Sequence, residues 1–263
     1  MSANTSERRA LMLREMGLTP QWRAREASGA TMPSPVPPMI AVPVVVPDAP
    51  EGVDGVSPLP SGDSERRAAI MQMDWPQLKA CVADCTQCGL HARRNKTVFG
   101  VGDENADWLF VGEGPGADED AQGEPFVGQA GKLLDAMLAA IQLKRGANVY
   151  IANMVKCRPP GNRNPEVGEA RACEPFLHRQ IDLIQPKLII ALGKVAATYL
   201  LAREASVASL RNKIHRYRGI PLIVTYHPAY LLRSLQEKAR AWEDLCFAVD
   251  TLQGLKNTGG ETI

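Results

Sequence analysis

Four short apolar runs that alternate with segments of helical period constrain the fold of this chain more than any other feature. The runs are Asp107 to Gly112, Val149 to Val155, Lys187 to Gly193 and Ile220 to Tyr226. Their length and nearly continuous apolar character are typical of strands that are covered on both faces. The segments of helical period are 131–143, 166–184, 194–202 and 236–252. This alternation predicts an α/β fold in which crossover helices cover a sheet of parallel strands.

The N-terminal part of the chain has a different composition. Nine of the 20 prolines lie between Thr31 and Gly62, in a stretch without aromatic residues. Such a stretch buries too little surface to offset its ordering entropy, so 31–73 is predicted to be a disordered linker. Within 1–30, Ser6 to Met16 is predicted to form a short amphipathic helix that is unstable alone. The folded domain is predicted over 74–254, with a flexible tail at 255–263.

Charge and hydropathy exclude several protein classes. The chain has 263 residues, with 30 Lys and Arg against 29 Asp and Glu, which excludes a histone-like polycation or a disordered charged tail. It has no apolar run near the roughly 20 residues that span a bilayer, and its polar start MSANTSERR lacks a signal-peptide core. We therefore expect a soluble cytoplasmic protein. We also expect a monomer. In a reducing compartment, the spacing of its six cysteines points to metal binding or catalysis before disulfides.

The near-neutral total hides two oppositely charged blocks. Residues 101–135 carry nine acidic residues and one lysine, a charge of −8. Residues 144–218 carry fourteen Lys and Arg against five acidic residues, a charge of +9. The second block can supply contacts to phosphates, so the small net charge does not exclude a nucleic acid partner.

The segments that follow the strands are the candidate functional loops, because ligands of parallel sheets bind beyond the C-terminal strand ends. The first loop, Gly112 to Asp120, has three glycines within five residues and four carboxylates. The glycines allow a ligand to approach the backbone closely. The loop is no phosphate-binding P-loop, because it lacks Gly-Lys-Ser/Thr and its acidic residues repel phosphate.

Three further residues near strand ends allow two interpretations each. Phe126, between Pro125 and Val127, either stacks on a planar ligand or packs as a plug under the loop. Asn153 either reads a hydrogen-bonding ligand edge or caps the backbone. His227, held before a proline, either performs acid or electrostatic work or is structural.

The cysteines predict a metal site. Cys85 and Cys88 form a Cys-x2-Cys pair, and Cys157 and Cys173 follow with fifteen residues between them. Four thiolates in this distribution could hold zinc or a four-iron cluster. Cys81 and Cys246 are interpreted as packing residues, with Cys81 as a rival ligand.

Taken together and in this order, these motifs resemble the family 4 uracil-DNA glycosylases, the iron-sulfur type, over about Asp74 to Leu252. The resemblance implies a three-layer α/β/α sandwich with a central four-stranded parallel sheet. It implies an enzyme that hydrolyses the N-glycosidic bond between uracil and deoxyribose in DNA and leaves an abasic site. It also implies a [4Fe-4S] cluster, with Cys85, Cys88, Cys157 and Cys173 as its ligands.

The same resemblance implies roles for the loop residues. Phe126 would stack on a flipped uracil, and Asn153 would read its amide edge. His227 would stabilise the negative charge on uracil O2, joined by backbone N–H groups near Glu113 and Gly114.

Water activation is less well defined by the sequence. Related families place an Asp in the first loop where this chain has Gly114. The candidates are Glu113, Glu119 and Asp120, of which Glu119 is favoured. A strong general base is not required if the sugar cation forms before water attacks, and the acidic block suits that cation.

Basic side chains complete the predicted DNA-binding surface. The candidates for phosphate contact are Arg158, Arg163, Arg211, Lys213, Arg216 and Arg233. His215 lies in the same basic region and carries little weight as a catalytic residue. The main alternative function is a non-catalytic nucleic-acid-binding or polymerase-associated module with a structural four-cysteine metal site. An iron-sulfur electron carrier is a third.

The N-terminal peptide carries a separate resemblance. Arg8 to Leu13, Met16 to Thr19 and Gln21 to Arg25 are similar to the N-terminal peptide of the psi subunit of the bacterial polymerase III clamp loader. This implies that residues 1–30 bind a clamp-loader subunit and that the linker tethers the enzyme to a replisome.

Overall fold

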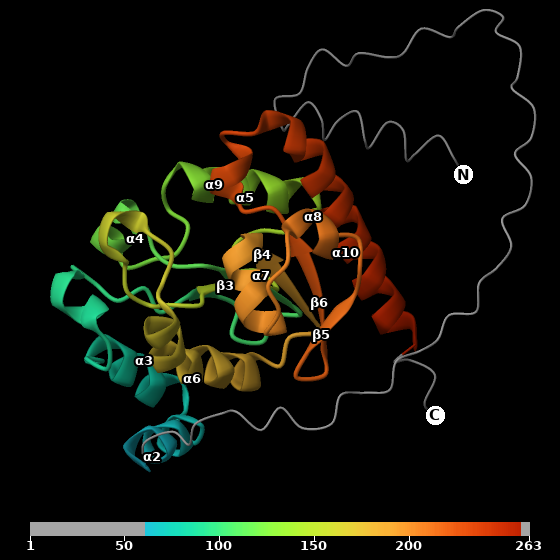
Figure 1. The fold of residues 1–263 in the computed structure, drawn as a ribbon. Coiled ribbons are helices and arrows are strands. Elements are labelled where there is room, and N and C mark those ends of the chain that lie inside the picture. Colours follow the sequence, from blue (N-terminus) through green and yellow to red (C-terminus); the bar gives the residue numbers. More distant parts are fainter. Residues whose placement is uncertain (1–60, 259–263) are drawn as a thin grey trace, which may run out of the picture. The chain divides into compact units, whose positions relative to one another are not determined.

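The computed structural model describes residues 61–258 (Figure 1). The predicted helix from Ser6 to Met16, the segment 1–30 predicted to bind a clamp-loader subunit and most of the predicted linker lie outside the described residues. The last residues of the predicted tail lie outside them as well.

The sheet has six strands in the described part of the chain. They are β1 (Val101–Gly102), β2 (Trp108–Gly112), β3 (Val149–Asn153), β4 (Leu188–Leu192), β5 (His215–Tyr217) and β6 (Ile220–Thr225), in the order β1-β3-β2-β4-β6-β5. The four predicted strands are confirmed: β3, β2, β4 and β6 are mutually parallel. The predicted number of four was too low, because β1 and β5 pair antiparallel at the two edges. With two and three residues, these edge strands are too short to show a periodic pattern.

Helices cover both faces of this sheet (Figure 1). The longer ones are α5 (Gln129–Ala140), α6 (Val167–Ile184), α7 (Gly193–Leu201) and α10 (Lys238–Thr258). Apolar residues of α5 and α10 pack with Phe110 on one face, and those of α6 and α7 pack with Leu109 and Val111 on the other. Successive residues of β2 thus point their side chains into the cores on opposite faces of the sheet, as the pleat of a strand requires. The predicted three-layer α/β/α sandwich is confirmed.

The shorter helices lie before or between these elements. They are α2 (Ser61–Ile70), α3 (Trp75–Ala83), α4 (Ala117–Gln122), α8 (Val207–Leu210) and α9 (Pro228–Leu231), with 3₁₀ turns at Gly89–Arg93, Pro160–Asn162 and Leu235–Glu237. Asp74 caps α3 in a capping box with Gln77. Across 61–258, no helix is both long and apolar enough to cross a membrane.

Two predicted boundaries were wrong. The linker prediction included α2, which begins directly after Pro60, where the composition changes to the helix formers Glu, Arg and Ala. The tail prediction began too early, because α10 continues to Thr258.

Asp107 joins three elements of the sandwich at the start of β2. Its carboxylate forms ion pairs with Lys187, just before β4, at 2.9 Å and with Lys256 of α10 at 2.8 Å. Burial alone would raise the pKa of Asp107, but hydrogen bonds from Lys256, Lys187 and Asn148 more than offset this and lower it to about 2. The ionised form is therefore the one that stabilises the fold.

Asp107→Asn should lower the melting temperature at pH 7 by roughly 2–4 °C, because it removes two partly buried ion pairs. The pKa in the folded protein lies below the ordinary 3.8, so this contribution is present above about pH 4 and is lost as the pH falls toward 2. Thermal melts from pH 7 to pH 3 measure it, with Glu204→Gln as control, since Glu204 pairs with Lys194 on the exposed surface. Equal losses in both variants would contradict the assignment.

Candidate active site

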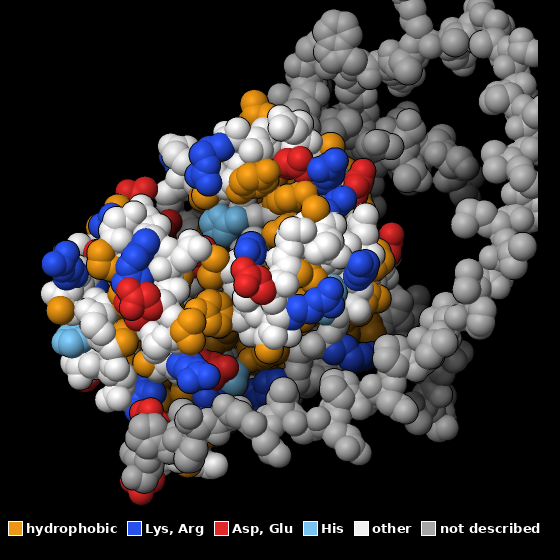
Figure 2. All heavy atoms as spheres, in the orientation of Figure 1, with side chains coloured by type: hydrophobic (Ala, Val, Ile, Leu, Met, Phe, Trp, Pro, Cys, Tyr) orange, Lys and Arg blue, Asp and Glu red, His pale blue; other side chains and the backbone are white. Residues whose placement is uncertain are grey.

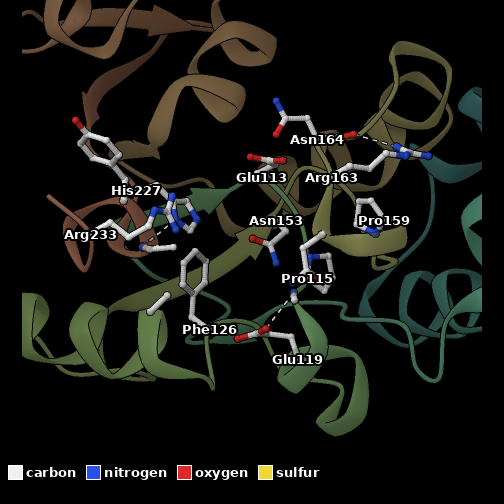
Figure 3. A pocket seen from close by; sticks show the side chains of 16 residues that line it. Glu113, Pro115, Glu119, Phe126, Asn153, Pro159, Arg163, Asn164, His227 and Arg233 are labelled. Carbon is white, nitrogen blue, oxygen red and sulfur yellow. Dashed lines mark hydrogen bonds between the residues drawn. The ribbon is translucent and has the colours of Figure 1, made fainter.

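A cavity of about 400 Å³ lies beyond the carboxyl ends of β2, β3 and β6 (Figure 3). The structure brings together in its lining most of the residues predicted for the site: Glu113, Gly114, Glu119, Phe126, Asn153, Arg163, His227 and Arg233. Asp120, Arg158, Arg211, Lys213 and Arg216 are not part of this lining. The residues predicted for the site therefore converge at the carboxyl ends of three strands, where parallel sheets bind their ligands.

Phe126 holds its ring in the cavity by means of an uncommon backbone conformation. Its φ is +56°, in the left-handed region, and the residue is 6 % exposed. The ring centroid lies 5.5 Å from that of His227 (Figure 3). A Cβ on Gly112 would lie 2.6 Å from Phe126 Cζ and 2.5 Å from Asn153 Oδ1, so this glycine leaves the space that both side chains occupy.

Asn153, the last residue of β3, is 2 % exposed. Its side-chain oxygen Oδ1 accepts no hydrogen bond from any residue in the described part of the chain. The interpretation of Asn153 as a backbone cap is therefore wrong for this oxygen. A buried acceptor without a partner is costly, and the cavity is where a ligand N–H could reach it.

His227 precedes α9 and accepts a hydrogen bond at its Nδ1 from the N–H of Ala229, at 3.1 Å. In the neutral ring this leaves the proton on Nε2, which becomes a hydrogen-bond donor. Burial, assisted by the positive charge of Arg233, lowers the pKa of His227 to about 4. At neutral pH the side chain is therefore an uncharged donor.

Two carboxylates predicted as catalytic candidates make hydrogen bonds that do not fit that role. Glu119, favoured for water activation, accepts at its two oxygens from the N–H groups of Gly116, Val127 and Gly128, at 3.0, 2.9 and 3.1 Å. These bonds bind the first loop to the segment that carries Phe126 and leave the carboxylate little capacity for water. Its geometry is that of a side chain that holds the loops.

Asp120 was wrongly predicted as a catalytic candidate. It is 1 % exposed, and its oxygens accept from the backbone and the amide of Asn95, at 2.9 and 2.7 Å. On α4, consecutive side chains point about 100° apart, so Asp120 faces away from the cavity that Glu119 lines.

Glu113 has the freest carboxylate in the cavity lining. Burial raises its pKa, and its side chain has no hydrogen-bond partner within residues 61–258. Figure 3 shows it between Asn153 and Asn164. It is the carboxylate best placed to meet a water molecule or a developing positive charge.

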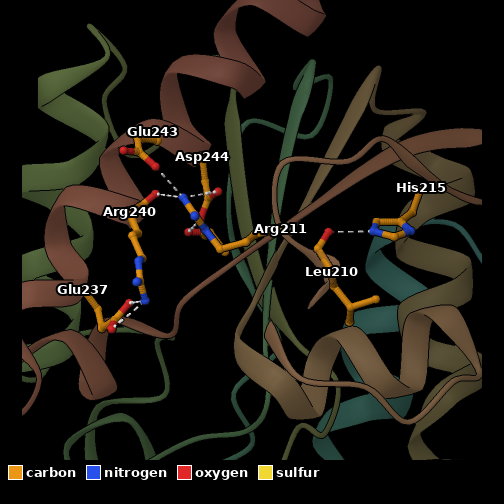
Figure 4. Close-up of polar contacts among 8 residues, drawn as sticks. Leu210, Arg211, His215, Glu237, Arg240, Glu243 and Asp244 are labelled. Atoms are coloured by element: carbon orange, nitrogen blue, oxygen red, sulfur yellow. Dashed lines mark hydrogen bonds and ion pairs between the residues drawn. The ribbon is translucent and has the colours of Figure 1, made fainter. Parts of the chain in front are cut away.

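Two of the basic side chains predicted to contact DNA phosphates form ion pairs with carboxylates of the protein. Arg211 is committed to Glu243 and Asp244 of α10, each at 3.0 Å, so its prediction as a DNA contact was wrong (Figure 4). Arg163 is similarly paired, with Glu166 and Glu169. On the face of the molecule that Figure 2 shows, acidic and basic side chains are interspersed.

The remaining predicted cations make weaker contacts. Arg158, Lys213 and Arg216 each donate to a single nearby oxygen, of Asn162, Ser209 and Gly219 respectively. Arg233 is exposed at the cavity and makes no side-chain hydrogen bond to the described residues. The His215 ring lies within hydrogen-bond distance of the Leu210 carbonyl, at 2.8 Å, and does not line the cavity (Figure 4).

The four predicted ligand cysteines, Cys85, Cys88, Cys157 and Cys173, line one second pocket. N–H donors that the sequence did not predict point at its sulfurs: Arg94 Nη1 lies 3.2 Å from Cys157 Sγ, the Lys156 backbone nitrogen lies 3.2 Å from Cys173 Sγ, and Arg66 Nη2 lies 3.9 Å from Cys85 Sγ. In the described part of the chain, no three His, Cys, Asp or Glu side chains are placed to hold a single metal ion. Cys81 and Cys246 do not line this pocket.

Lys156 is the fully buried cation beside the cysteine pocket. Its ammonium donates to the Asn153 carbonyl at 2.9 Å and to Gln180 Oε1 at 2.6 Å, and no carboxylate of the described residues pairs with it. Burial lowers the pKa of Lys156 to about 8, while Cys173 acts in the opposite direction. A buried cation with only neutral partners indicates a compensating negative group nearby.

Comparison with known proteins identifies relatives of the chain. Residues 99–246 match the model of the uracil DNA glycosylase superfamily. A type-4 uracil-DNA glycosylase of Thermotoga maritima is 44 % identical over 60 % of this chain and 83 % of its own length. One from Archaeoglobus fulgidus is 42 % identical over 57 % and 79 %, and one from Pyrobaculum aerophilum is 39 % identical over 66 % and 92 %.

Gly112→Ala should destabilise the protein by about 1–3 kcal/mol, because the added methyl group overlaps Asn153 Oδ1 and Phe126 Cζ. Chemical denaturation measures the free energy of unfolding. Gly168→Ala is the matched control, since a Cβ there meets nothing within 4 Å. Equal stability of the two variants would show that the space at Gly112 is not needed.

Proposed function

The chain belongs to the uracil-DNA glycosylase superfamily and, within it, to the type-4 enzymes, and from this we propose that it hydrolyses the bond between uracil and deoxyribose in DNA. One observation carries the proposal. A stacking ring, an amide with an unpartnered buried oxygen and a neutral imidazole meet in a single cavity.

Recognition begins when uracil leaves the base stack, which costs least where it is mispaired or single-stranded. The ring of Phe126 stacks on the flipped base. Asn153 Oδ1 accepts from uracil N3–H, and its amide nitrogen donates to O4. Cytosine presents the opposite pattern at this edge, so a fixed amide rejects it by leaving buried groups unpaired.

Bond cleavage places negative charge on the leaving uracil and positive charge on the sugar. His227 donates its Nε2 proton in a hydrogen bond to O2 and stabilises the anion without itself being charged. The backbone N–H groups near Glu113 and Gly114 assist. Glu113 faces the cavity and stabilises the sugar cation or positions the attacking water, the role that the sequence had favoured for Glu119.

The cysteine pocket fits an anionic metal group. It offers four thiols and N–H donors that point at their sulfurs, and the neighbouring Lys156 needs a compensating charge. We propose that Cys85, Cys88, Cys157 and Cys173 hold a [4Fe-4S] cluster. Such a cluster binds thiolates that lie farther apart than the ligands of one zinc ion. Its contribution is structural, because it connects the segment before β1 to β3 and α6, and hydrolysis needs no redox step. Binding of residues 1–30 to a clamp-loader subunit and a monomeric state remain proposals of the same kind.

The excision test uses anaerobically prepared full-length protein and an oligonucleotide with one uracil, followed by alkali cleavage of abasic sites. Wild-type protein should cleave at uracil. His227→Ala should slow excision by roughly 10²- to 10³-fold, the usual effect of removing one transition-state donor. Asn153→Asp should lose the preference for uracil over cytosine.

Two variants outside the cavity lining serve as controls. His215→Ala and Asn105→Asp should both excise at the wild-type rate, because neither residue lines the cavity. No excision by metal-loaded wild-type protein would favour the non-catalytic module instead.

The metal proposal has its own test. The purified protein should contain iron and acid-labile sulfide in equal amounts and absorb in the visible range, and Cys157→Ser should reduce both. Cys246→Ser is the control, since Cys246 does not line the pocket. Zinc without visible absorption would contradict the cluster.

A further inference from the structure

The peptide between Phe126 and Val127 is held at both edges by charged side chains. Its N–H donates to Glu119 Oε1 at 2.9 Å. Its carbonyl accepts from Arg145 Nη2 at 2.8 Å, and Arg145 Nη1 donates to the preceding carbonyl, of Pro125, at 2.9 Å. An anion thus holds the N–H side and a cation the C=O side of the peptide that follows the stacking residue.

Arg145 is itself fixed in place. It lies between α5 and β3, outside the cavity lining, and its side chain is 22 % exposed. Asp135 of α5 accepts from its Nε at 3.0 Å and from Nη2 at 2.9 Å. The guanidinium is therefore oriented before it meets the two carbonyls, and hydrogen bonds of a charged donor are about twice as strong as neutral ones.

The conformation at Phe126 requires such support. A left-handed φ in a residue with a bulky side chain is strained, and it persists only where the surroundings over-determine it. The Phe126 carbonyl also lies against α5 so closely that a Cβ on Gly131 would be 1.7 Å from its oxygen. The hydrogen bonds to the peptides before and after Phe126 hold its φ and ψ, and with them the direction in which its side chain leaves the backbone.

We propose that Arg145 is a positioning residue for uracil recognition: with Glu119 it fixes the Phe126–Val127 peptide, and so the plane of the ring on which uracil stacks. The inference rests on the proposed function, and it extends the site to a side chain that touches neither the base nor the sugar. Stacking contributes to binding before and during the reaction alike. Loss of Arg145 should therefore weaken binding and leave the chemical step nearly unchanged.

The experiment compares full-length wild type with Arg145→Met, Arg145→Lys and a control, Arg179→Met. Arg179 is half-buried and likewise donates to a backbone carbonyl, that of Met73, but does not line the cavity. The measurements are the inhibition constant of free uracil, KM and kcat on a uracil-containing oligonucleotide, and the melting temperature.

Arg145→Met removes the hydrogen bonds to both carbonyls and should raise the uracil inhibition constant and KM about tenfold each, with kcat within about threefold. Arg145→Lys should recover part of the affinity, because an ammonium can still donate to one carbonyl. Arg179→Met should bind uracil as the wild type does, whatever its melting temperature.

Wild-type excision combined with an unchanged inhibition constant in Arg145→Met would overturn this inference alone. A loss in kcat without a change in KM would also overturn it. A wild-type chain that excises no uracil would overturn the proposed function and the inference together. Should Arg145→Met melt below the assay temperature, Arg145→Lys decides, and wild-type affinity in that variant counts against the role.

Discussion

The parallel register of β2 and β3 is the constraint on which the site depends. It pairs Gly112 with Asn153, so the first loop and the amide leave the sheet at the same level. Only a residue without a side chain at Gly112 lets the amide oxygen and the Phe126 ring approach each other over the strand end. His227 reaches the same place from β6, the other side of the sheet centre. The cavity is therefore a consequence of sheet topology, and its side chains are held by charged groups around it.

The two chemical centres share one short stretch of chain. Asn153 ends β3 and faces the cavity, whereas Cys157, four residues later, faces the cysteine pocket. Lys156 lies between them: its backbone N–H points to Cys173 Sγ, and its ammonium holds the Asn153 carbonyl. A group bound by the cysteines would therefore stabilise the segment from which the base-reading amide extends. A metal group held there would have a structural use in a hydrolytic enzyme without taking part in the reaction.

The sequence predicts the layers and the place of the site, because apolar periodicity and strand-end position are local properties. It predicts the four central strands, the helices that cover them, and Phe126, Asn153 and His227. It does not predict β1 and β5, whose pairing depends on neighbours distant in the chain. The contacts of Asp120, Arg211 and Arg145 are made with partners 19 to 33 residues away, which are Asn95, Asp244 and Phe126 respectively. Such partners leave no periodic signal, so these side chains were misassigned or missed.

The central claim is that Phe126, Asn153 and His227 form one pocket for uracil. The most direct measurement is a crystal structure of the protein soaked with free uracil. The base should stack on the Phe126 ring, with its N3–H donating to Asn153 Oδ1 and its O2 accepting from His227 Nε2. Uracil bound elsewhere, or bound in this cavity with its N3–H facing away from Asn153, would contradict it.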